Sequence, residues 1–146
     1  MQAALGRYQL RQLDDWVAQR RQNVAVFNEV LNGTDGIRLT VPDNQSFHAC
    51  YKYYFFIEPE RLKSDWNRDR VVAEIHAGGA PCFTGTCPEI YREEGFINLY
   101  GHQTPLPVAK ELGETSVMMN VHPGITPALV TDCAEVVRGV MKQAVR

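Results

Sequence analysis

The longest helical pattern in this chain lies at its very start. Asn32 and Gly33 end the pattern in the manner of a C-terminal glycine cap. The pattern predicts one helix over residues 2–31, about 45 Å long at the usual rise per residue. Its buried face is marked by apolar side chains spaced three, four or seven residues apart, namely Leu10, Leu13, Val17, Val24, Phe27 and Leu31.

The first turn of this helix has no capping residue. No Ser, Thr, Asp or Asn stands before Gln2 to accept the free backbone N–H groups that every helix start exposes. The helix is also longer than a domain of 146 residues needs. We therefore expect residues 1–146 to be a single domain that is a piece of a larger protein, with the first helical turns packed against another part.

Composition excludes several classes of partner. The formal net charge of −2 argues against a nucleic-acid-binding surface, and the longest apolar run, residues 53–57, is far too short to cross a membrane. Four cysteines in a chain of this length favour free thiols and a cytoplasmic location. Cys82 and Cys87, with His76 or His102, match zinc-ligand spacings poorly, so no metal site is predicted.

The remaining elements alternate between strands and helices. Strands are expected at residues 36–40, 50–57 and 115–121, the second being the most strongly β-rich. Helices are expected at residues 67–77, 86–94, 104–113 and from Thr126 toward the end. This order predicts an α+β fold, in which a small, mostly antiparallel sheet is covered by the long N-terminal and C-terminal helices.

The stretch with the most functional character is residues 79–96, GAPCFTGTCPEIYREEGF. Thr86 and Glu89 have the spacing of a capping box, which would place residues 82–85 just before a helix N-terminus. Free N–H groups and the helix dipole attract an anion at such a place. The same residues also fit a plain helix cap with a turn before it, and both interpretations stay open.

Lys52 is the only charged residue of the strand at 50–57. A lysine in an otherwise apolar strand is either an edge residue or a ligand contact. We expect Lys52 and Thr84 to line one concavity, in which both could contact an anionic ligand. A third possibility is nucleophilic catalysis by Cys82 or Cys87 beside a histidine, which needs a spatial pairing that the sequence does not show.

Several segments, taken in order, resemble the C-terminal domain of DegT/StrS-type sugar aminotransferases. The likeness covers nearly the whole chain. It is carried by the segments QAALGRYQL (2–10), the Arg20–Arg21 and Phe27–Asn28 pairs, HACYKYY (48–54), Gly78–Gly79, Tyr91–Arg92, PVAKELG (107–113) and VHP (121–123).

The resemblance implies a fold-type I enzyme that uses pyridoxal phosphate (PLP). Such enzymes typically transfer an amino group from glutamate to a keto sugar carried on a nucleotide, in pathways such as surface-polysaccharide precursor synthesis. The family's large N-terminal domain supplies the Schiff-base lysine, and the four lysines here fit no such segment. The resemblance thus implies PLP in a homodimeric parent enzyme, none bound by this fragment, and no catalytic residue within it.

In the family, this domain closes one side of the substrate pocket. Many members carry a histidine or tyrosine pair where this chain has Cys82 and Phe83. The alternative is a free-standing ligand-binding or regulatory α+β domain with an anion site at the loop before Thr86. The resemblance implies that the nucleotide-sugar pocket is shaped by Tyr51, Lys52, Cys82, Phe83, Thr84, Gly85 and Tyr91.

Overall fold

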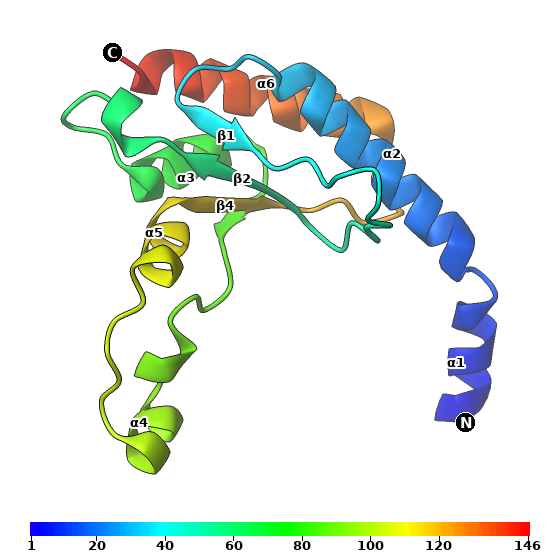
Figure 1. Ribbon diagram of the computed structural model, residues 1–146. Coiled ribbons are helices and arrows are strands. Elements are labelled where there is room, and N and C mark those ends of the chain that lie inside the picture. Colours follow the sequence, from blue (N-terminus) through cyan, green and yellow to red (C-terminus); the bar gives the residue numbers. More distant parts are fainter.

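The protein is described by a computed structural model that covers all residues, 1–146. It is an α+β fold, as predicted, with one four-stranded antiparallel sheet (Figure 1). In chain order the elements are α1 (Gln2–Leu10), α2 (Leu13–Leu31), β1 (Ile37–Leu39), β2 (Tyr53–Ile57), the 3₁₀ turn η1 (Pro59–Arg61), α3 (Arg68–Ala77), β3 (Cys82–Thr84), the 3₁₀ turn η2 (Ile90–Arg92), α4 (Glu94–Tyr100), α5 (Pro107–Thr115), β4 (Ser116–Met119) and α6 (Pro127–Ala144).

The strands lie in the order β1-β2-β4-β3, and the register fixes which side chains share a face. Tyr53 lies opposite Met119, which lies opposite Cys82 on its other side. The next row joins Tyr54, Met118 and Phe83. Because side chains alternate along a strand, these two rows point to opposite faces of the sheet.

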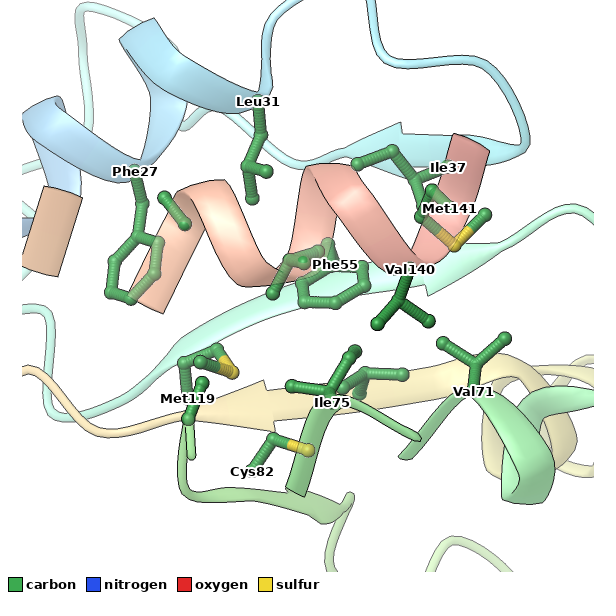
Figure 2. Close-up of a cluster of buried hydrophobic side chains, with 14 of the residues drawn as sticks. Phe27, Leu31, Ile37, Phe55, Val71, Ile75, Cys82, Met119, Val140 and Met141 are labelled. Carbon is green, nitrogen blue, oxygen red and sulfur yellow. The ribbon is translucent and has the colours of Figure 1, made fainter. Parts of the chain in front are cut away.

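Helices α2, α3 and α6 cover the face that carries Tyr53. Figure 2 shows the core between these helices and the sheet, where side chains from α2, α3 and α6 meet those of β2, β3 and β4. Phe27 stacks on the Tyr53 ring at a centroid distance of 4.7 Å. Burying one side chain of this size contributes roughly 1.5–3 kcal/mol, so this face supplies most of the stability of the domain.

The predicted helix over residues 2–31 is two helices rather than one. The chain bends at Arg11 and Gln12, where the N–H of Gln12 bonds to the carbonyl of Gln9 instead of continuing the α-helical pattern (Figure 1). Helix α1 has no buried residue, whereas α2 buries Phe27 and Leu31. Nothing in this chain therefore holds α1 in line with α2.

The predicted helix at residues 86–94 is wrong, and so is its capping box. Residues 86–89 are not helical, and a 3₁₀ turn precedes the short α4. The Glu89 carboxylate accepts hydrogen bonds from the Tyr91 hydroxyl and from Arg92 instead of from the backbone at Thr86. The anion site expected at a helix start before Thr86 is consequently absent. Residues 82–84, expected to lie in the loop before that helix, form β3.

Candidate functional site

The second face of the sheet has far less cover than the first. Helix α5 lies below the end of the sheet at which β4 begins (Figure 1), while Tyr54 and Phe56 are only half-buried and Phe83 is 45% exposed. Helix α1 and the segment that carries α4 both project from the body of the domain in the direction of this open face (Figure 1). A ligand or another part of a protein could reach the sheet from this side alone.

Both projecting segments expose apolar side chains. On α1, Leu5, Tyr8 and Leu10 are 59%, 62% and 68% exposed, and on α4, Leu99 and Tyr100 are 75% and 68% exposed. Apolar side chains grouped in this way mark contact surfaces more often than they mark a solvent-facing exterior. The open face is thus flanked on both sides by surfaces suited to another body of protein.

Two predicted site residues, Lys52 and Thr84, lie on either side of β4, contrary to expectation. Thr84 alternates with Phe83 and shares the helix-covered face with Cys82, although its own side chain is exposed at the sheet edge. Lys52 lies just before β2, which begins at Tyr53, and β4 separates β2 from β3. The cavity of about 430 Å³ that Lys52 lines has no wall from β3, so Lys52 and Thr84 do not line it together.

Cys82 is a core residue and cannot contact a ligand on the open face. Its side chain is 2% exposed, and its thiol donates to the carbonyl of Val72 in α3 at 3.4 Å. The glycine at position 85 is also required by packing, because a Cβ there would stand 2.5 Å from Oγ of Ser116. The close approach of β3 to β4 thus explains this glycine without a ligand.

Tyr91 ties its own segment together. Its hydroxyl donates to Glu89 and accepts from the N–H of Leu106 at 3.0 Å, and the carboxylate beside it raises its pKa. Tyr91 also lines a cavity of about 450 Å³ together with Arg92 and Lys110. Tyr91 thus holds the connection between α4 and α5 in place through these two hydrogen bonds.

The loop between β1 and β2 is a possible binding region that the sequence did not indicate. Two cavities of about 410 and 430 Å³ adjoin this loop, and both are lined by His48 and Cys50. Lys52 lines the larger one. The signal that could have found this region is the Arg20–Arg21 pair, because each arginine donates to a backbone carbonyl of the segment 48–51.

The structure pairs one cysteine with a histidine, and it is not one of those expected. The Cys50 thiol lies 3.3 Å from Nδ1 of His48, and Nδ1 also accepts the N–H of Cys50 at 3.1 Å. Burial raises the pKa of Cys50, Cys82 and Cys133, and a hydrogen bond to Glu93 raises that of Cys87. Neutral thiols are poor nucleophiles, which argues against a cysteine-dependent reaction.

The chain offers neither a metal-binding cluster nor a membrane-spanning helix. No group of three or more His, Cys, Asp or Glu side chains is arranged to hold a metal ion. None of the helices is both long and apolar enough to span a bilayer.

Comparison with known proteins decides the family. The model of the DegT/DnrJ/EryC1/StrS aminotransferase family matches residues 1–138. The chain belongs to this family. A sequence relative is the dTDP-4-dehydro-2,3,6-trideoxy-D-glucose 4-aminotransferase of Saccharopolyspora spinosa, which is 26% identical over an alignment of 140 residues that covers 92% of this chain and 32% of the relative.

Solved structures of aminotransferases share the fold. An aminotransferase from Psychrobacter cryohalolentis superposes with a TM-score of 0.91 at 36% identity, covering 98% of this chain and 38% of that protein. DesV of S. venezuelae, solved with a ketimine intermediate, gives a TM-score of 0.84 at 20% identity over 97% of this chain and 36% of DesV. The 146-residue chain thus spans only about a third of the length of these relatives.

Proposed function

We propose that the chain forms the C-terminal part of a PLP-dependent aminotransferase that acts on a nucleotide-linked keto sugar. The observation that carries the proposal is the family match over residues 1–138. The relative from Saccharopolyspora spinosa is named for a dTDP-linked sugar, which makes a dTDP-sugar the expected substrate class. A cytoplasmic homodimer that makes amino sugars for surface polysaccharides is the wider setting that we propose.

The residues of this chain do not offer PLP a complete site. The Lys63 ammonium donates to the carbonyl of Gln143 at the surface, and Lys110 pairs with Glu114 at 3.7 Å. Lys142 is exposed on α6. Lys52 lies beside the exposed Tyr51 ring and lines the open cavity next to the β1–β2 loop. The Schiff-base lysine is accordingly expected in another part of the enzyme.

The chain's proposed role is to wall one side of the substrate pocket from the open face of the sheet. Tyr51, Lys52 and Phe83 remain candidates for direct contact, because all three are at least partly exposed and Phe83 belongs to the open face. Thr84 and Gly85 would affect the substrate pocket only indirectly, by fixing the position of the edge strand β3. Tyr91 would support the projecting segment.

The alternative of a free-standing anion-binding domain loses its main support. That alternative depended on a helix beginning at Thr86, and residues 86–89 are not helical. The exposed apolar surfaces of α1 and α4 also favour a larger enzyme over an independent module.

Trapping of PLP with borohydride tests the proposal. The chain alone is expected to retain no stoichiometric pyridoxyl group, and the same chain extended by its upstream coding sequence is expected to carry one, on a lysine outside residues 1–146. Peptide mass spectrometry locates the label. Specific labelling of one lysine within the chain, or no label in the extended protein, would overturn the proposal.

A further inference from the structure

The segment that projects from the domain beside the open face carries a cavity of its own. The cavity has a volume of about 450 Å³, and its wall is built from η2, α4, the connection after α4 and the first turn of α5. In Figure 1, α4 lies at the tip of this segment, away from the sheet. We call this space the arm cavity; its wall includes Glu89, Tyr91, Arg92, Ile97, Pro105 and Lys110.

Two cations line the arm cavity from separate elements. Arg92 is the last residue of η2, and Lys110 lies in the first turn of α5. Nη1 of Arg92 donates to Glu89 at 3.2 Å, which leaves other N–H groups of the guanidinium for a ligand. The Lys110 ammonium lies 3.7 Å from the exposed carboxylate of Glu114, and an exposed pair of this kind holds its partners only weakly. Both cations therefore have hydrogen-bond donors to offer an anion.

The single carboxylate in the wall is already engaged. Glu89 accepts hydrogen bonds from the Tyr91 hydroxyl and from Arg92, and its side chain is 16% exposed. The Tyr91 hydrogen bond and the charges of Arg92 and Lys110 lower the pKa of Glu89, so this carboxyl group is ionised at neutral pH. Its negative charge stands against the two positive charges of Arg92 and Lys110, so the arm cavity has a surplus of positive charge.

A second cavity borders Lys110 and has the opposite character. It measures about 440 Å³, and its wall carries four glutamates together with Arg38 and Lys110. These carboxylates repel an anion, so an anion beside Lys110 is expected in the arm cavity, where Arg92 is the second cation. Ile97 and Pro105 also give the arm cavity an apolar part, against which a short carbon chain can pack.

We propose that the arm cavity binds a small aliphatic dicarboxylate, with one carboxylate at Arg92 and the other at Lys110. Hydrogen bonds between ionised partners are the strongest that these side chains make, and the methylene groups of such a ligand would cover Ile97 and Pro105. Since Arg92 and Lys110 stand on either side of α4 in the chain, the ligand would also join the two ends of the projecting segment. Helix α4 has no buried residue of its own, so this link would steady it. The ligand is not the nucleotide sugar, and the inference goes beyond the proposed function.

Titration of the 146-residue chain with succinate, followed by NMR at constant ionic strength, tests the inference. Acetate and inorganic phosphate are the comparison ligands, since acetate lacks the second carboxylate and phosphate lacks the carbon chain. We expect saturable shifts of amide signals at residues 89–92 and 105–110, and tighter binding of succinate than of either comparison ligand. A higher fixed concentration of sodium chloride should weaken binding, because salt screens exposed charges. Hydrogen exchange at residues 94–100 should slow when succinate is bound.

Substitution of each cation tests where the two carboxylates bind. Arg92→Gln and Lys110→Gln should each weaken succinate binding about twofold to fivefold, the range for the loss of an exposed ion pair. Lys110→Arg keeps the charge and should bind succinate like the parent chain. Arg7→Gln on α1 and Lys142→Gln on α6 remove exposed cations elsewhere, and both controls should also bind succinate like the parent chain.

Several results would overturn the inference. Succinate would produce no saturable shifts, acetate or phosphate would bind as tightly as succinate, or the shifts would lie outside the projecting segment and α5. Unchanged succinate binding in both Arg92→Gln and Lys110→Gln would overturn it as well. None of these results changes the outcome of PLP trapping, so the proposed function stands or falls separately.

Discussion

At the scale of single residues, several of the residues predicted to line the substrate pocket have a structural role in the domain. Cys82 fills the core, and Gly85 allows β3 to approach Ser116. The sequence showed that these residues were unusual but could not show what lay beside them. Asn23, in contrast, attracted no attention and is completely buried, with its amide bonded to the carbonyl of Ile125 at 3.1 Å.

Replacing Asn23 by alanine should therefore destabilise the domain. The Asn23 amide also accepts from Gln19 and donates to the carbonyl of His122, so its loss removes three hydrogen bonds and leaves the half-buried carbonyl of Ile125 without this donor. We expect urea unfolding to show a loss of about 1–3 kcal/mol. Gln22→Ala, at an exposed site next to Asn23 in α2, is the control and should change little. Equal effects of the two substitutions would contradict this role.

The Cys82 thiol makes stability depend on pH in the alkaline range. Burial raises the pKa of this thiol from an ordinary 9.0 to about 11. The folded chain therefore holds its proton where the unfolded chain has lost it, so stability is complete below about pH 9 and falls as the pH rises toward about 11. Urea unfolding at both ends of this range should show a smaller decline for Cys82→Ala than for the parent chain. Equal declines would refute the assignment.

At the scale of elements, the sequence predicted what local pattern controls and failed where long-range packing decides. The strand predicted at residues 50–57 and the last helix have strong periodicity; the last helix is present as α6, and the strand is present in shorter form as β2, which begins at Tyr53. The helix at 86–94 rested on two residues of a capping box, which Tyr91 and Arg92 disrupt by engaging Glu89. The single helix at 2–31 divides because its first part has nothing to pack against.

Helix α1 should be only marginally stable in the isolated chain. It is a nine-residue helix with no buried side chain and no side-chain cap. Helices this short need tertiary packing to persist in water. Hydrogen exchange is expected to show little protection at residues 5–10 and strong protection at the buried turns of α2 and α6. Strong protection of residues 5–10 in a demonstrated monomer would mean that α1 is stable without a partner.

The edge strand β3 gives a second test at this scale. A methyl group at residue 85 would collide with Ser116, so Gly85→Ala should force β3 away from β4 and lower stability. Gly95, the exposed glycine of α4, has open space within 4 Å of the position that a methyl group would take, and Gly95→Ala is the control. Thermal unfolding should show a lower midpoint for Gly85→Ala only. An unchanged midpoint would mean that β3 can move away from β4 without a loss of stability.

At the scale of the whole molecule, the domain has one well-packed side and one side with little cover. The core between the sheet and helices α2, α3 and α6 accounts for its stability, while the open face, α1 and α4 expose apolar side chains (Figure 1). Family members of about three times this length supply the natural candidate for that body. The resemblance identified the family from the sequence, but only the sheet register showed which residues share the open face.

Amino transfer by the extended protein tests this interpretation most directly. The chain joined to its upstream coding sequence would be incubated with PLP, ¹⁵N-glutamate and a dTDP-linked keto sugar. We expect ¹⁵N to appear in a dTDP-amino sugar by mass spectrometry, and no product from residues 1–146 alone. Product formed by the isolated chain, or none formed by an extended protein that binds PLP and the nucleotide sugar, would contradict it.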